Sequence, residues 1–132
     1  MFIQINPASS TPIYVQIMEQ IKYAIASGVA KEGEQLLSVR ELARQLRVNP
    51  NTISKAYHEL EREKYLTTHK GKGVFIAPSN SVLTLEEKER LVGQKLEAAL
   101  VDAQNLGLSF KEVRDILKKI MDNFKRQEKS RE

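Results

Sequence analysis

The chain of 132 residues lacks cysteine and tryptophan altogether, and it has only two histidines. Without cysteine it can form no disulfide, thiol nucleophile or cysteine-ligated zinc site, and His58 and His69 are too few for another metal site. We therefore expect neither a metal nor another cofactor. No window approaches roughly 18 consecutive apolar residues, and the N-terminus lacks the pattern of a signal peptide. These absences predict a soluble, cytoplasmic protein that does not contact a membrane.

The remaining composition is that of a globular protein with a small excess of positive charge. Apolar residues make up 41% of the chain and charged residues 29%, which argues against disorder throughout. The formal net charge is +4 and the pI is about 9.3. Residues 38–76 carry this whole excess, with eight Lys and Arg side chains against four glutamates, and residues 79–132 are nearly neutral. The distribution permits an anionic partner, although a solvated charged face is the plainer alternative.

Helix-start signals divide the first part of the chain into short elements. Thr11, as an N-cap followed by Pro12, opens a helix that Gly28 is placed to end. After a polar connection, Ser38 and Glu41 form a capping box, which predicts a second, short helix.

A third helix and a β-hairpin follow. Asn49 is the expected N-cap, and Pro50 the first residue, of a helix that runs to about Glu63. The runs 65–69 and 73–77 are rich in β-branched and aromatic residues, and the glycine between them favours a tight hairpin turn.

The third predicted helix has an apolar side and a polar, basic side, because successive residues advance by about 100° around a helix. The apolar residues, expected in the core, are Ile53, Ala56, Tyr57 and Leu60. The residues on the opposite side are Asn51, Lys55, His58 and Arg62. We also assign Tyr14, on the apolar stripe of the first helix, to the core.

The segment that begins at Pro78 is the one linker-like stretch, so we place there the boundary between two domains, 1–78 and 79–132. Beyond it, capping boxes at 84–87 and 109–112 open two amphipathic helices. A helical hairpin this short is marginal alone, and its apolar stripes need a second copy of the chain to cover them. The residues that we expect in this homodimer interface are Leu96, Leu100, Leu117, Ile120 and Phe124.

Three helices followed by a hairpin is the order of a winged helix-turn-helix. A short helix, a tight turn and a helix with a polar exposed side fit the DNA major groove, which is about 12 Å wide. The hairpin tip, Lys70-Gly71-Lys72, places two cations where they can lie against the backbone or in a minor groove. The predicted fold class is mainly α with a small β-hairpin: a winged helix-turn-helix followed by a two-helix dimerisation tail.

Five separated motifs occur in order between residues 10 and 77. They are Pro12-Ile13-Tyr14-x-Gln16-Ile17, Leu36-x-Ser38-Val39-Arg40-Glu41-Leu42-Ala43, Val48-Asn49-Pro50-Asn51-Thr52, Lys55-Ala56-Tyr57-x-x-Leu60-Glu61 and Gly71-Lys72-Gly73-x-Phe75. In order and spacing they resemble the GntR family of bacterial transcription regulators, and the short tail resembles its YtrA-like branch. Two positions depart from the family pattern: Leu37 replaces a usual proline, and Lys64 stands where glycine is common.

The resemblance implies a DNA-binding transcription regulator. A homodimer paired through the tail presents two recognition helices to an inverted-repeat operator, and by covering a promoter it is expected to repress. The resemblance implies that its targets include its own operon and neighbouring transporter genes. Family positions assign DNA contacts to Ser38, Arg40, Asn51, Thr52, Lys55, Lys70 and Gly71, and the residues themselves add Arg44, Ser54 and Lys72. A solvated surface explains Arg44 and His58 equally well, and His69 could meet phosphate from the hairpin.

Other classes of function find less support. No Ser/His/Asp set, pair of buried carboxylates or glycine-rich phosphate loop stands out, so we do not expect an enzyme. A winged-helix module that binds RNA or protein is the remaining alternative, and the basic, polar side of the third helix argues against it. No residue indicates a small-molecule effector, and any pocket for one would have to lie between the tail and the DNA-binding domain or at the dimer interface.

Overall fold

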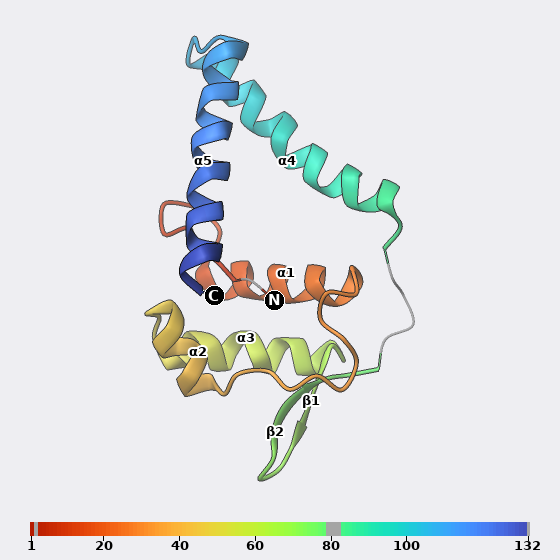
Figure 1. The fold of residues 1–132 in the computed structure, drawn as a ribbon. Coiled ribbons are helices and arrows are strands. Elements are labelled where there is room, and N and C mark those ends of the chain that lie inside the picture. Colours follow the sequence, from red (N-terminus) through yellow and green to blue (C-terminus); the bar gives the residue numbers. More distant parts are fainter. Residues whose placement is uncertain (2, 79–82, 132) are drawn as a thin grey trace. The chain divides into compact units, whose positions relative to one another are not determined.

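The computed structural model describes residues 1, 3–78 and 83–131 and divides the chain into two compact units, Met1–Thr84 and Leu85–Glu132. The N-terminal unit contains α1 (Ile13–Ala26), α2 (Val39–Leu46), α3 (Pro50–Arg62), β1 (Leu66–His69) and β2 (Gly73–Ile76), and the C-terminal unit contains α4 (Leu85–Asn105) and α5 (Phe110–Arg131) (Figure 1). The predicted fold, mainly α with a small β-hairpin and two further helices, is confirmed, whereas dimerisation through those two helices stays a prediction. The predicted linker falls mostly on residues 79–82, which lie outside the described residues.

Helix α1 begins one residue later than predicted. Pro12 is its N-cap and no side chain caps the helix, so the prediction of Thr11 as N-cap was wrong. The physical reason is that the backbone of Thr11 is engaged on both sides: its N–H donates to Ser9 Oγ at 3.1 Å, and its carbonyl accepts from Gln16 Nε2 at 2.8 Å. At the other end Gly28, with φ +81°, follows the last turn as predicted.

Two glutamines one turn apart on α1 hold the N-terminal segment. Each side-chain amide forms a pair of hydrogen bonds with the backbone of one residue, as a neighbouring β-strand would. The side-chain amide of Gln20 both accepts from and donates to the backbone of Gln4, each at 2.9 Å. Gln16 pairs with the backbone of Asn6 in the same way, at 2.9 and 3.0 Å. The segment thereby places Ile3 in the core, where it is buried.

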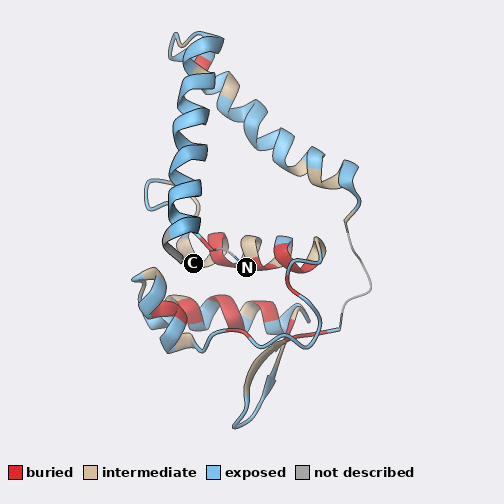
Figure 2. Cartoon of the chain, in the orientation of Figure 1, coloured by how far each residue is buried: buried red, intermediate tan, exposed pale blue. Residues whose placement is uncertain are grey.

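The core of the N-terminal unit is centred on the contact between α1 and α3, whose facing sides are buried (Figure 2). Ile17 and Ile21 of α1 and Ile53 and Leu60 of α3 have no exposed surface, and Leu66 of β1 completes the cluster. Full burial of such a side chain stabilises the fold by about 1.5–3 kcal/mol. The predicted apolar side of α3 is therefore confirmed, and its burial fixes how α3 is turned.

Local capping holds α2 and α3 in place. The capping box is present: Glu41 N–H donates to Ser38 Oγ at 3.1 Å, and Ser38 N–H to Glu41 Oε1 at 3.3 Å. Asn49 Oδ1 accepts from Asn51 N–H at 2.8 Å. Both predicted helix starts are confirmed. Between the helices, Arg47 adopts the left-handed conformation, φ +57°, that reverses the chain.

Strands β1 and β2 form an antiparallel hairpin in which Leu66 pairs with Ile76 and His69 with Gly73. Gly71, at φ +79°, occupies the tip in a conformation that favours glycine. The predicted strands thus agree with the structure to within a residue at each end.

The polar connection before α2 pairs with the free edge of β2, which no sequence pattern indicated. Leu36 N–H donates to Val74 O, and Ile76 N–H donates to Glu34 O, both at 2.9 Å. Residues 33–36 lack the alternation of apolar and polar residues that marks a strand, because they extend an edge that is mostly solvated. The segment ties the hairpin to the start of α2.

The C-terminal unit consists of the two predicted helices and a tight turn. Ser109 and Glu112 form the expected capping box, with hydrogen bonds of 3.0 and 3.1 Å. Ala103 is the one buried residue of α4 and α5 among those whose burial is described. Within the described ranges, no helix is both long and apolar enough to cross a lipid bilayer.

Lys64 is a point of backbone strain, because its φ of +69° lies in the left-handed region. A residue with a Cβ costs on the order of 1 kcal/mol there. We expect Lys64→Gly to raise the free energy of unfolding in urea by about 0.5–1 kcal/mol, after allowance for the freedom that glycine adds to the unfolded chain. Lys64→Ala keeps the Cβ and should give no such gain. Equal stability of the two variants would contradict this account.

Candidate nucleic-acid interface

The N-terminal half of α3 presents polar side chains to solvent. Asn51, Ser54 and Lys55 are exposed, and Thr52 is half-buried. The Asn49 cap occupies one backbone N–H of the first turn. Thr52 N–H donates to the Asn49 carbonyl at 2.9 Å, and Pro50 has no N–H to offer. The helix dipole gives this end of α3 a partial positive charge, which favours phosphate.

The start of α2 adds a second polar surface. Ser38 uses its oxygen as an acceptor in the capping box, so its O–H remains able to donate. Arg40 and Arg44 are exposed and lie four residues apart, on one side of the helix. Neither guanidinium forms an ion pair with any residue that the structure describes. Both are therefore available to an anionic partner.

The wing tip, residues 70–72, is exposed and is held by a glutamine from the segment that pairs with β2. Gln35 Nε2 donates to the carbonyl of Lys72 at 2.9 Å. This contact requires glycine at the next position, since a Cβ on Gly73 would lie 2.6 Å from Gln35 Nε2. Gly73, a residue of the last motif, therefore leaves room for the glutamine that supports the wing tip. The sequence alone did not indicate this role.

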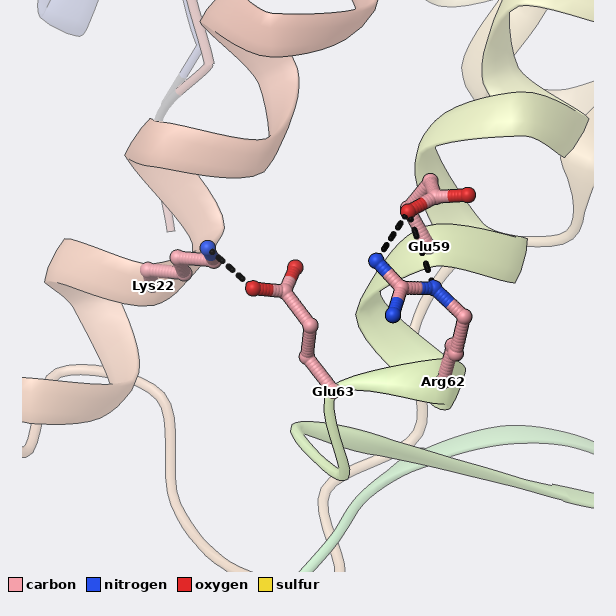
Figure 3. A network of polar contacts seen from close by, with 4 residues as sticks. All are labelled: Lys22, Glu59, Arg62 and Glu63. Atoms are coloured by element: carbon pink, nitrogen blue, oxygen red, sulfur yellow. Dashed lines mark hydrogen bonds and ion pairs between the residues drawn. The ribbon is translucent and has the colours of Figure 1, made fainter.

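Glutamates in the C-terminal half of α3 are paired with cations (Figure 3). Arg62 donates to Glu59 Oε2 from Nε at 3.1 Å and from Nη2 at 2.7 Å. Lys22 of α1 pairs with Glu63 at 3.1 Å. The hydrogen bond from Arg62 lowers the pKa of the Glu59 carboxyl below its ordinary value, so Glu59 stays charged and engaged at neutral pH.

The other two glutamates of residues 38–76 are engaged as well. Glu61 Oε2 accepts from Thr68 Oγ1 at 3.0 Å, and Glu41 belongs to the capping box of α2. The N-terminal half of α3 contains no acidic residue. The two halves of the helix thus differ in charge, and only the N-terminal half suits a polyanion.

Lys55 lies over the ring of Tyr14 on α1, with its Nζ 4.1 Å from the ring centroid. The helical pattern alone places Lys55 on the exposed side of α3, and it is exposed. Tyr14 packs against the core as predicted, but it is half-buried and carries the lysine on its ring. The contact joins α1 to the surface of α3, and no short-range motif indicated it.

Tyr57 is a core residue, as predicted, with a structural hydrogen bond. Its hydroxyl donates to the carbonyl of Leu37 at 2.7 Å. Burial raises the pKa of this hydroxyl above its ordinary range, and the charge of Glu41 adds to the shift. The bond fixes the chain just before Ser38, at the position where the motif pattern usually has proline.

The two histidines serve no common site. His58 is exposed on α3, and the ring of His69 packs edge-on against Phe75 with centroids 5.1 Å apart. No group of three or more His, Cys, Asp or Glu side chains that could hold a metal occurs among the residues that the structure describes.

A cavity of about 470 Å³ is lined entirely by residues of the N-terminal unit. Its apolar wall includes Ile3, Ile21 and Leu42, and its rim carries the carboxylates of Glu34 and Glu41. The polar residues that line it are exposed to solvent, except Tyr57, whose hydroxyl is already bonded to the Leu37 carbonyl. Among the described residues, no buried polar side chain of the lining is therefore left to bind a ligand.

Gly73 is a position at which a single added Cβ disturbs the wing support. In Gly73→Ala the new Cβ meets Gln35 Nε2, and the alanine is forced to a φ near +124° that residues with a Cβ rarely adopt. We expect the free energy of unfolding in urea to fall by about 1–2 kcal/mol. The double variant Gln35→Ala/Gly73→Ala should recover the part due to the clash. Gly93→Ala, with open space around its Cβ, is the control and should not destabilise; a Gly73→Ala protein as stable as the wild type would refute the assignment.

Comparison with known proteins places these features in a family. Residues 13–76 match the family described as bacterial regulatory proteins, gntR family. The HTH-type transcriptional repressor YtrA of Bacillus subtilis (strain 168) is 41% identical over 123 residues, which are 93% of this chain and 95% of that protein.

Two solved structures extend the comparison. A crystal structure from Listeria monocytogenes EGD-e, described as a transcriptional antiterminator, has a TM-score of 0.59 and 40% identity and covers 92% of this chain and 90% of its own. The DNA-binding domain of AraR in complex with operator ORX1 has a TM-score of 0.50 and 30% identity over 58% of this chain and 93% of its own. The winged helix-turn-helix, its polar α3 and a tail of YtrA-like length therefore have one explanation: this chain belongs to the GntR family, whose members are sequence-specific DNA-binding transcription regulators and not enzymes.

Proposed function

We propose that the protein is a transcriptional repressor that binds an inverted-repeat operator as a homodimer. The observation that carries the proposal is the solvent-facing side of the N-terminal half of α3, which is polar and has no acidic residue, together with a wing tip that Gln35 supports. Similarity to YtrA, a named repressor, along 93% of the chain supports repression as the outcome of binding. Its targets would include its own operon and neighbouring transporter genes.

Three surfaces would contact the operator. The start of α2 meets the phosphate backbone, α3 enters the major groove, and the wing tip lies against the backbone or in the minor groove. Asparagine, serine and threonine side chains on α3 can hydrogen-bond to base edges, which gives sequence preference. The proposed contact residues are Ser38, Arg40, Arg44, Asn51, Thr52, Ser54, Lys55, Lys70, Gly71 and Lys72.

The C-terminal unit would pair two protomers. Leu96 is 53% exposed, Leu117 41% and Ile120 45%, and Leu100 is half-buried. On α5 the apolar residues recur at intervals of three and four, which makes one stripe along the helix. A second copy related by two-fold symmetry covers such a stripe and presents two α3 helices to half-sites about 34–36 Å apart, or a multiple of this. The proposed interface residues are Leu96, Leu100, Leu117, Ile120 and Phe124.

Arg40→Ala and Lys55→Ala test the DNA surface. Each should weaken operator binding roughly tenfold, because each removes one phosphate contact. The fall of the log association constant with log salt concentration should become less steep by about 0.9. The operator comes from selection of genomic fragments by the purified protein, and affinity from gel-shift titration at several salt concentrations. The charge-matched controls Arg114→Ala and Lys118→Ala on α5 should bind as the wild type does. If neither Arg40→Ala nor Lys55→Ala changes the titration, the assigned surface is wrong.

Competition separates DNA from RNA as the partner. An unlabelled DNA duplex of the selected sequence should displace the bound probe, and an RNA duplex of the same sequence should not. Displacement by RNA at equal concentration would favour an RNA-binding winged helix instead.

Ile120→Asp tests dimerisation. A carboxylate in the apolar stripe of an interface carries a large desolvation cost, so this variant should sediment with the 15.0 kDa mass of one chain. The wild type at micromolar concentration should sediment at twice that mass. Lys119→Asp, on the opposite side of α5, is the matched control and should remain dimeric. A monomeric wild type would overturn the homodimer.

A further inference from the structure

Lys55 is held by α1, and this contact has a consequence for DNA binding. Its ammonium group sits 4.1 Å from the centroid of the Tyr14 ring. We propose that Tyr14 is a positioning residue for Lys55: its ring holds the ammonium group at the side of α3 next to α1, where it meets a DNA phosphate. This inference rests on the proposed contact between Lys55 and DNA.

The ring of Tyr14 is a fixed support. It packs against the core and lies in the first turn of α1. That turn is fastened by Gln16, whose Nε2 donates to the carbonyls of Thr11 at 2.8 Å and Asn6 at 3.0 Å. A lysine side chain otherwise rotates about four bonds, and a support that orients it beforehand reduces the entropy lost when it binds.

The nearest acidic residue along α3 does not capture the lysine. Glu59 follows Lys55 by four residues, the spacing at which helical side chains pair. Its Oε2 is instead taken by two N–H groups of Arg62 (Figure 3). Lys55 has no ion pair with any residue in the described part of the chain.

An aromatic ring suits this task better than a carboxylate would. The π face attracts a cation without cancelling its charge, so the ammonium group keeps its full attraction for phosphate. Lys55 also lies nearer to α1 around α3 than Asn51 does, so the ring draws it toward the rim of the groove. Phosphates lie at the rim, whereas base edges lie at the floor. Tyr14 thus favours a backbone contact that strengthens binding without changing the sequence preference.

Substitutions at Tyr14 test the inference in operator titrations at fixed salt. Tyr14→Leu removes the ring and should weaken binding about three- to fivefold, the usual effect of losing a cation–π contact. Tyr14→Phe keeps the ring and should bind within about twofold of the wild type. A Tyr14→Phe protein as weak as Tyr14→Leu would overturn the proposal, because the hydroxyl would then be the group that acts. Thermal unfolding of each variant sets a titration temperature at which all of them are folded.

A double-mutant cycle with Lys55→Ala separates positioning from a general structural effect. If Tyr14 acts through Lys55, Tyr14→Leu causes no further loss of affinity in the Lys55→Ala protein. Equal losses in both backgrounds would overturn the inference and leave the proposed function intact. If Lys55→Ala binds normally while Arg40→Ala binds weakly, the inference fails and the DNA surface stands without Lys55. Normal binding by both of these variants would refute the proposed surface and the inference together.

Discussion

The packing of α3 against α1 decides which side chains the N-terminal unit offers to a partner. Ile53 and Leu60 of α3 belong to one core cluster with Ile17 and Ile21 of α1, and all four side chains are fully buried. A rotation of α3 by about 100°, the angle between successive residues, would expose Ile53 and Leu60 to water and turn polar residues of α3 inward. The cost of exposing such side chains, about 1.5–3 kcal/mol each, makes the observed orientation the stable one. Every proposed DNA contact on α3 depends on that constraint.

The charge of the N-terminal unit's surface depends on which charged side chains pair with one another, as well as on how many there are. Residues 38–76 contain four glutamates. Arg62 holds Glu59, Lys22 holds Glu63, and the remaining two take part in a hydrogen bond and a capping box. The lysine and arginine side chains that are proposed to bind DNA therefore have no acidic partner among the described residues. The chain's excess of +4 lies within residues 38–76. An aromatic ring that holds Lys55 follows the same logic, since it orients a cation without neutralising it.

Features that depend on neighbours in the sequence could be predicted, and those that join distant segments could not. The capping box at Ser38 and the buried side of α3 follow from spacings of three and four residues, and the structure confirms both. The clasp of Gln16 on the N-terminal segment, the pairing of residues 33–36 with β2 and the contact between Tyr14 and Lys55 were not predicted. Each brings together residues that are ten or more positions apart, so no local pattern records it. Most of the proposed contact residues were suggested by family resemblance, because an exposed polar side chain is compatible with solvent alone.

Amide hydrogen exchange of the protein, free and bound to its selected operator duplex, tests the central claim most directly. The account predicts new protection at residues 38–40, 51–55 and 70–72, the three surfaces that are proposed to contact DNA. The interior of α4 should exchange at the same rate in both states. Protection confined to α4 and α5, with α3 and the wing unchanged, would contradict the account.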